Sequence, residues 1–354
     1  MKLREIENRD SSIDILRGFA ALTVVLGHLP STPVVLVRWI YSFHMPLFFI
    51  CSGMVFSAAL SYREFFVKKF KTLVVPYFSL GICLWLLRNL MKCFLALMSG
   101  GHPLADWNIG NAIASLLLAH RLHEYYLGIW FLCTLFLAEL IFYFVVKSSK
   151  QKIILPLLSV GGVVLQWFIL EHVRGFYWSI DLVPVCLAFM SIGYMIKKCK
   201  TFHESICRIW LLPVALCMSI VCSYLGYIRG GQVDLCMSCM SDPFFFFLAA
   251  IAGSWTFMII SKHIGHVNPL IYFGRNSLIT YIFQTSLTVP LAQELSGILA
   301  RRFIPLSDSA FIWTLEFLTV LVLSFALITI INYVFPWMLG KQSTRKKERE
   351  LVTA

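Results

Sequence analysis

Long apolar runs separated by short polar loops dominate the chain. A bilayer core of about 30 Å needs about 20 apolar residues per crossing helix, and about ten runs meet that length. They lie near 12–31, 40–60, 73–97, 127–146, 153–172, 177–196, 207–228, 243–261, 269–290 and 310–336. The pattern predicts an all-α, polytopic membrane helix bundle of about ten transmembrane helices. The longest polar stretch, 98–126, is expected to be a loop with one interfacial helix.

The charges of the loops orient this predicted bundle. When the N-terminus is placed inside, the inner loops hold most of the basic residues: Arg63, Lys68, Lys69, Lys71, Lys147, Lys150, Lys152, Lys197, Lys198, Lys200, Arg208 and Lys262. By the positive-inside rule both termini are then cytoplasmic. Residues 1–11 lack a signal-peptide pattern. We therefore expect a cytoplasmic N-terminal segment at 1–11, one membrane domain at 12–336 and a basic cytoplasmic tail at 337–354.

Composition agrees with this class and excludes another. Of the 354 residues, 59% are hydrophobic and 14% are charged, and the mean hydropathy is +0.79, values typical of an integral membrane protein. The net charge of +12 follows from the basic inner loops and implies contact with anionic membrane lipids. A nucleic-acid partner would need a basic folded face, which the sequence does not provide. The sequence leaves the oligomeric state open.

The first run contains three ionisable residues, although it should cross the membrane. In "SIDILRGFAALTVVLGHLP", Arg17 and His28 are eleven residues apart, which places them on one helix face about 16 Å apart along the axis. Asp14 lies on nearly the same face. Such a stripe can line a water-filled path inside a bundle. The alternative is structural: Asp14 favours a helix N-terminus, Arg17 can extend to the interface, and His28 can be a hydrogen-bonded core residue.

The second run adds another histidine. "FHMPLFFICSGMVF" enters the membrane from the outer side in this topology, so His44 is expected at a depth similar to that of His28. Pro46 is expected near the start of this helix, where no amide donor is needed. Because the connecting loop is short, the first two helices should pack as an antiparallel hairpin that brings the two histidines near one another.

Other polar and aromatic residues allow two interpretations each. Tyr126 and Trp130 can stack on a sugar or belong to the interfacial aromatic belt. Glu139 is an intramembrane acid with no evident partner, so it is either a substrate ligand or a hydrogen-bonding residue between helices. Arg275 is expected at the inner start of the ninth helix, where it can bind a coenzyme or anchor the helix.

One pair of cysteines stands apart from the other nine. Cys236 and Cys239 form a single CxxC on a predicted outer loop. Free thiols, a disulfide and a metal site all remain open for this pair, but the motif lacks the second pair or spaced histidines that zinc needs. We expect no metal.

Several of these segments resemble the membrane-bound acyltransferase-3 family. "IDILRGFAALTVVLGH" and "FHMPLFFICSG" carry the resemblance, and the His-Met-Pro form is similar to the fucose 4-O-acetylase branch. Weaker similarities are "REFFVKKFKTLVVPY", "LGIWFL", "FMSIGYMIKK" and "FGRNSLITYIFQ". The resemblance extends from about residue 11 to residue 335. Gln284 stands where the family commonly has histidine, which puts any catalytic role of that position in doubt.

The resemblance implies O-acyl transfer, usually of acetyl from cytoplasmic acetyl-CoA to a sugar hydroxyl. The acceptor would be a cell-surface glycan, such as an exopolysaccharide or lipopolysaccharide, or a lipid-linked precursor, in the inner membrane of a bacterium. His28 would act as the base with His44 assisting. Arg17 would join that catalytic set and, oriented by Asp14, bind the coenzyme phosphates. Lys68, Lys69, Lys71 and Arg275 complete the expected coenzyme-binding residues, and Tyr126, Trp130 and Glu139 the expected substrate-binding residues.

Two other functions remain open. A transporter or lipid-linked glycan flippase also needs many helices and a polar stripe, but it should show inverted repeats, which the sequence lacks. A covalent acyl-enzyme through Cys51 or Ser52 would need an adjacent base, and His44 is about two helical turns away. The acceptor sugar and the choice between acetyl and succinyl are not indicated.

Overall fold

The computed structural model describes residues 11–99, 107–119, 129–173, 175–303 and 309–341. These residues are mainly helical, and their only recorded β pairing is an isolated bridge between Asp234 and Cys239. Within the described residues, eight helical segments are long and apolar enough to cross a membrane. The predicted all-α polytopic bundle is therefore confirmed. Most of the two expected terminal segments, 1–11 and 337–354, lies outside the described residues.

Two of the expected membrane crossings are not among these eight segments. The first run forms α2 (Ser11–His28), but its charged and imidazole side chains lower its hydropathy, so it is not counted among the candidate spans. The run expected at 269–290 is divided into α13 (Asn268–Arg275), α14 (Ser277–Phe283) and the π-helix η4 (Gln284–Thr288). At the first break the Asn276 side chain donates to the Tyr272 carbonyl, a local bond that competes with helix continuation.

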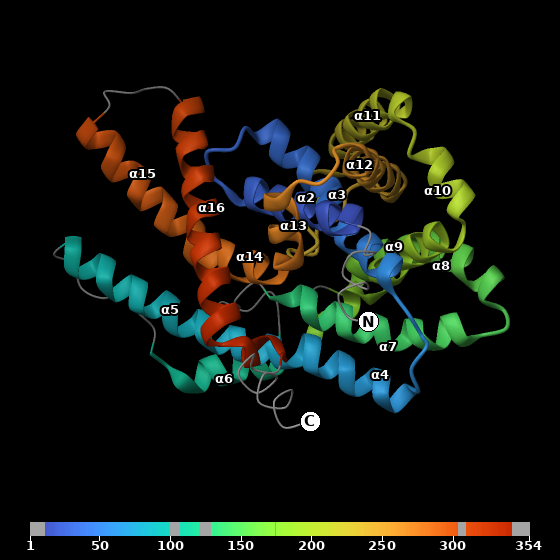
Figure 1. Ribbon diagram of the computed structural model, residues 1–354, viewed down its shortest axis with the longest axis horizontal. Helices are drawn as coiled ribbons and strands as arrows, with labels where there is room; N and C mark the ends of the chain where they lie inside the picture. The colour runs from blue at the N-terminus through green and yellow to red at the C-terminus, as the bar shows by residue number, and fades with distance from the viewer. Residues whose placement is uncertain (1–10, 100–106, 120–128, 174, 304–308, 342–354) are drawn as a thin grey trace. The chain divides into compact units, whose positions relative to one another are not determined.

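The chain forms two compact units, and the first contains the first two helices. It comprises residues 1–57, 145–174 and 184–281. Its helices are α2, α3 (Val34–Val55), α8 (Gln151–His172), most of α9 (Val183–Lys198), α10 (Lys200–Ile206), α11 (Leu212–Gly230), α12 (Pro243–His263) and α13. In Figure 1, α2 lies beside α3 and beside α13, and it contacts both; its contact with α3 is the one that the predicted hairpin of the first two helices requires.

Small residues let α2 and α13 approach closely. A Cβ atom added to Gly18 would meet the backbone of Leu270, and one added to Gly274 would meet the backbone of Asp14. Glycines on both helices thus allow backbone-to-backbone packing, as at other membrane helix interfaces. This contact fixes the start of α2 beside the end of α13, 261 residues later in the chain.

α3 begins earlier than the sequence suggests. It starts at Val34, so Pro46 lies inside the helix rather than near its start. The apolar residues from Val34 onward continue the helix toward the outer loop, which explains the difference. Pro46 is tolerated there even though it cannot donate a backbone hydrogen bond within the helix. His44 consequently stands near the middle of α3.

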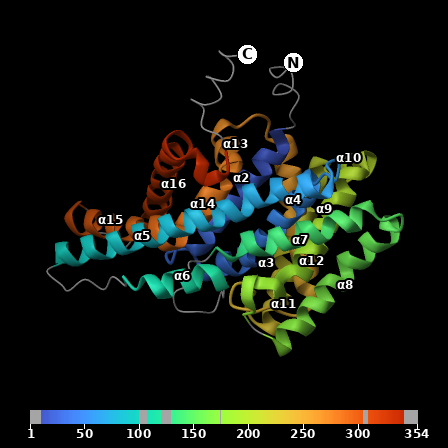
Figure 2. The ribbon, with the colours of Figure 1, turned by 90° about the horizontal axis from the view of Figure 1, so that it is seen from below.

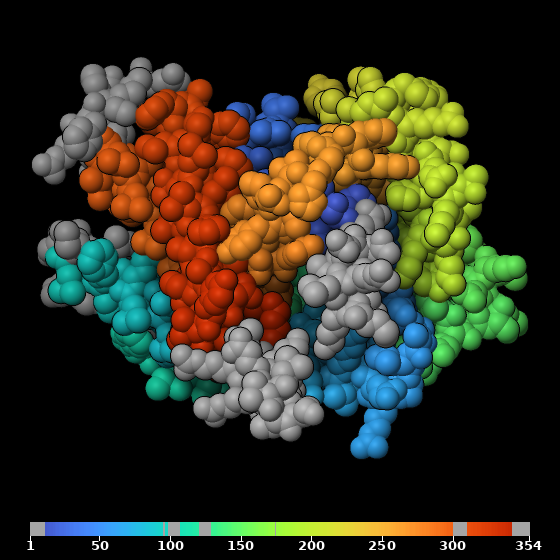
Figure 3. Space-filling model, in the orientation of Figure 1, coloured from blue at the N-terminus to red at the C-terminus, as the bar shows by residue number. Residues whose placement is uncertain are grey.

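The second unit comprises residues 58–144, 175–183 and 282–354. Its elements are α4 (Tyr62–Lys69), the π-helix η1 (Phe70–Val74), α5 (Val75–Ser99), α6 (Ile109–Leu118), most of α7 (Trp130–Lys147), η2 (Tyr177–Leu182), η4, α15 (Val289–Phe303), α16 (Ser309–Val334) and η5 (Pro336–Leu339). Figure 2 shows α4 and α5 following one another through η1, with α7 beside α4. Figure 3 shows α16 on the surface of this unit.

The loop expected between the third and fourth crossings contains a helix. It is α6, and its last carbonyls receive bonds from two aromatic residues. The Tyr77 hydroxyl donates to Leu116 O at 2.9 Å, and Trp178 Nε1 donates to Leu117 O at 2.9 Å. These bonds satisfy acceptors that a helix C-terminus otherwise leaves unpaired.

Candidate active site

The two histidines are held in the same way by their own helices. His28 Nδ1 lies 2.8 Å from the carbonyl of Val24, and His44 Nδ1 lies 2.9 Å from the carbonyl of Ile40. A carbonyl oxygen only accepts, so in each neutral ring Nδ1 carries the proton. Nε2 of each ring is then an acceptor. The local geometry gives both imidazoles the tautomer that a general base needs.

Tyr41 brings the two histidines into one cluster. Its ring centroid lies 5.7 Å from that of His28 and 5.0 Å from that of His44. His28 ends α2, whereas Tyr41 and His44 lie one turn apart on α3, so the helix hairpin joins all three rings. We call His28, Tyr41 and His44 the ring cluster. His44 is buried, and His28 and Tyr41 are half-buried.

A loop between α11 and α12 adds an acid to the cluster. Asp234 and Cys239 exchange two backbone bonds of 2.8 Å, which close a tight turn, and the Met237 amide donates to Asp234 Oδ1 at 3.2 Å. The Asp234 carboxylate acts electrostatically on both His28 and Tyr41. Tyr41 and Asp234 were absent from the sequence prediction. The three-residue spacing of Tyr41 from His44 was a usable signal, whereas nothing in the local sequence marked Asp234.

The CxxC lies in this turn. No disulfide joins Cys236 and Cys239 in the structure. No group of three or more histidine, cysteine or acidic side chains suited to a metal occurs among the described residues.

The opposite end of α2 holds a buried ion pair. Asp14 is 1% exposed, and its Oδ2 accepts from Arg275 Nε at 2.8 Å. The expected pairing of Asp14 with Arg17 is therefore wrong. Arg275 ends α13 instead of starting a long helix, because the helix is interrupted at Asn276. The Arg275 side chain is 47% exposed, so the guanidinium remains partly accessible, and Arg17 on α2 is half-buried.

The helix α2 thus joins two different chemical environments. It is a single α-helix from Ser11 to His28. Arg17 and His28 lie on one face, separated by about 16 Å of helical rise. The cationic groups lie toward the N-terminal end of α2, and the imidazole bases lie at its C-terminal end.

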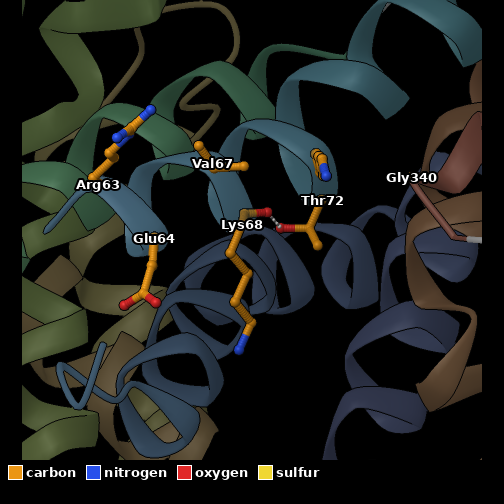
Figure 4. A pocket seen from close by; sticks show the side chains of 7 residues that line it. Arg63, Glu64, Val67, Lys68, Thr72 and Gly340 are labelled. Carbon is orange, nitrogen blue, oxygen red and sulfur yellow. Dashed lines mark hydrogen bonds between the residues drawn. The ribbon is translucent and has the colours of Figure 1, made fainter. Parts of the chain in front are cut away.

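A separate pocket of about 600 Å³ lies in the second unit (Figure 4). Its lining consists of Arg63, Glu64, Val67, Lys68, Lys71, Thr72 and Gly340. We call it the basic pocket, because three of these side chains are cationic and Glu64 is the only acid. Glu64 Oε2 accepts from the Ser61 hydroxyl at 2.7 Å in a capping box, which holds it at the start of α4. The pocket therefore offers an excess of positive charge.

Lys69 does not line the basic pocket. Its Nζ lies 2.7 Å from Oε1 of Glu139 on α7, and the Glu139 side chain is 5% exposed. The sequence indicated no partner for Glu139, and the structure supplies one from a distant segment. Lys68 and Lys71 face the pocket while Lys69 forms a structural ion pair.

The other expected substrate residues are distributed differently. Trp130 is 4% exposed and packs edge-on against Phe131, with ring centroids 6.3 Å apart. A side chain buried in this way is not part of an exposed aromatic belt. Tyr126 lies outside the described residues. Gln284 is buried at the first position of η4.

A bundle of apolar helices that holds two base-forming histidines against one tyrosine has the features of a membrane-embedded enzyme. Comparison of the sequence identifies the chemistry. Residues 10–333 match the acyltransferase-3 family, described as an acyltransferase domain, and the protein belongs to that family. It is therefore a membrane acyltransferase. The fucose 4-O-acetylase branch is not distinguished by this match. No curated protein and no solved structure matches the chain.

Proposed function

We propose that this protein is an O-acetyltransferase that moves an acetyl group from cytoplasmic acetyl-CoA to a sugar hydroxyl of a cell-surface glycan or its precursor. The observation that carries the proposal is the tautomer of His28 and His44, which leaves Nε2 of each ring ready to accept a proton. Membership of the acyltransferase family supports the transfer of an acyl group. The bacterial inner membrane is the proposed location, with the basic loops in the cytoplasm.

The ring cluster suits base-catalysed acyl transfer. The sugar oxygen attacks the thioester carbonyl carbon while His28 Nε2 takes the hydroxyl proton. When the C–S bond breaks, the coenzyme thiolate leaves and receives that proton from the imidazolium. The acetyl group ends on the sugar oxygen, and His28 returns to its neutral form.

Tyr41 and His44 then take different tasks. The tautomer of neutral His44 makes its Nε2 an acceptor, so it orients the acceptor hydroxyl. The hydroxyl of Tyr41 is the donor available within the cluster for the oxyanion. The Asp234 carboxylate stabilises the imidazolium that His28 becomes during proton transfer.

The cationic groups suit the coenzyme phosphates. Arg17 and Arg275 offer guanidinium groups in the first unit. In the second unit, the basic pocket offers the guanidinium of Arg63 and the ammonium groups of Lys68 and Lys71. Guanidinium and ammonium groups bind phosphate by charge-assisted hydrogen bonds. The volume of about 600 Å³ falls in the range of small-molecule sites. We propose that the adenosine phosphates bind to the cations of the basic pocket.

The test uses inverted membrane vesicles that contain matched amounts of wild type, His28→Gln or His172→Gln, with acetyl-labelled acetyl-CoA supplied outside. His172 is the matched control, because its Nδ1 makes the same bond to a backbone carbonyl, Phe168 O at 2.9 Å, on the exposed surface of α8. We expect labelled glycan or free acetate from wild type and the control, and a loss of at least a hundredfold with His28→Gln.

Two results would contradict the proposal. Equal labelling by His28→Gln and wild type would remove His28 from the chemistry. An absence of acetyl-CoA consumption by the folded wild type would exclude acetyl-CoA as the donor.

A further inference from the structure

A second pocket opens between α8 and α9 in the first unit, away from the ring cluster. Near the middle of α8 the two helices touch: a Cβ atom added to Gly162 would lie 2.6 Å from Pro184 O and 3.0 Å from the Cβ atom of Ala188. Toward the N-terminus of α8 and the C-terminus of α9, a cavity of about 350 Å³ lies between them. Close contact at one end and larger side chains at the other produce this wedge.

The wedge combines a cationic mouth with an apolar wall. Lys152 on α8 and Lys198 on α9 line it from opposite sides, and both are exposed. Lys198 Nζ lies 5.4 Å from the ring centroid of Tyr194, which also lines the wedge. No acidic side chain is among the lining residues. Two positive charges therefore face the cavity without a neutralising carboxylate in its wall.

The apolar part of the wall continues onto the outside of α8. Leu155 and Pro156 line the wedge from α8, and Met195 lines it from α9. Ile153 and Leu157, which are 64% and 65% exposed, lie next to them on the outer surface of α8. In a membrane this surface contacts acyl chains. The wedge is thus open to the hydrocarbon region on one side and basic at its mouth.

We propose that this wedge binds one anionic glycerophospholipid. The phosphodiester lies between Lys152 and Lys198, and the first part of an acyl chain packs on Leu155, Pro156 and Met195 and continues along α8. Basic pockets between membrane helices favour anionic head groups. A free phosphate would satisfy the lysines but leave the apolar wall unused, which is why we assign the site to a lipid. The proposal does not depend on the acyl-transfer reaction.

The experiment is native mass spectrometry of the full-length protein in detergent, titrated with dioleoylphosphatidylglycerol or dioleoylphosphatidylcholine. Wild type is compared with Lys152→Gln/Lys198→Gln. The matched control is Lys150→Gln/Lys200→Gln, which removes one lysine next to the same end of each helix from positions that do not line the wedge. All four lysines are exposed, so the variants should fold.

We expect wild type and the control to bind one phosphatidylglycerol in preference to phosphatidylcholine. The wedge variant should bind it about thirtyfold more weakly, the effect expected from two lysine contacts with an anionic membrane surface. Equal weakening in the control would overturn the proposal, because the effect would then be general surface charge. Equal binding of both lipids by wild type would also overturn it, as would displacement of the lipid by millimolar glycerol phosphate, which has the charge without the acyl chain.

Discussion

The ion pair between Lys69 and Glu139 predicts that two adjacent lysines have different roles. Lys69→Met would leave the carboxylate of Glu139 buried without this cation. Removal of one partner from a buried ion pair costs about 3–5 kcal/mol. For a chain of 354 residues, an unfolding entropy of about 2.1 cal/mol/K per residue gives about 0.7 kcal/mol/K in total. The expected fall in Tm is therefore about 4–7 °C.

The assay is thermal unfolding of the purified protein in detergent, with acetyl-CoA turnover measured on the same samples. Lys68→Met is the matched control, because Lys68 is the preceding residue and lines the basic pocket. We expect Lys68→Met to leave Tm within about 1 °C of wild type and to raise the KM for acetyl-CoA several-fold, because an exposed cation contributes little to stability. The double variant Lys69→Met/Glu139→Leu should recover most of the lost stability, since replacing both members of a buried pair is often nearly neutral.

Two results would refute this reasoning. If Lys69→Met left Tm unchanged but raised KM as much as Lys68→Met, Lys69 would be a coenzyme ligand as the sequence suggested. If the double variant were as unstable as Lys69→Met alone, the loss would come from packing of the lysine stem and not from removal of the cation beside the Glu139 carboxylate.

Three further variants test the ring cluster and the contact between α2 and α13. Tyr41→Phe should lower kcat about a hundredfold with little change in KM, because it removes the proposed hydrogen-bond donor to the oxyanion. An unchanged single-turnover rate in this variant would exclude Tyr41 as that donor. Asp234→Asn should lower kcat about tenfold and shift the pH profile of kcat/KM, and an unaltered profile would show that the carboxylate does not act on His28. Gly274→Ala should destabilise the protein by about 1–3 kcal/mol in thermal unfolding, because the added Cβ atom would meet the backbone of Asp14. If the variant unfolded at the Tm of wild type, α13 would be able to shift away from α2 at no cost in stability.

The sequence predicted local structure well where one helix determines the outcome. The apolar runs give the helices, and the spacing of Arg17 and His28 places both on one face of α2. The short loop between the first two helices also led to the correct hairpin, which places the rings of His28 and His44 at 5.7 Å and 5.0 Å from the ring of Tyr41.

The partners that side chains find in distant segments could not be predicted from the sequence. Asp14 bonds to Arg275, which is 261 residues away, and the nearer Arg17 was the more economical choice from spacing alone. Glu139 and Lys69 likewise meet through packing of α7 against α4. Asp234 acts on the ring cluster only because a loop folds back, and periodicity carries no information about where a loop goes.

The π-helical turn η1 joins α4, which lines the basic pocket, to α5, whose Tyr77 is buried in the interior. It therefore sets how these two parts are rotated relative to one another. A π-helical turn is an α-helical turn with one added residue. Removing one residue from Phe70–Val74 would rotate α5 by about 100° relative to α4. Tyr77 would then point away from the α6 carbonyl that it now bonds, while Lys68 kept its place. One added residue in an otherwise regular α-helix is therefore enough to set the rotation of the packed face of α5 relative to the basic pocket on α4.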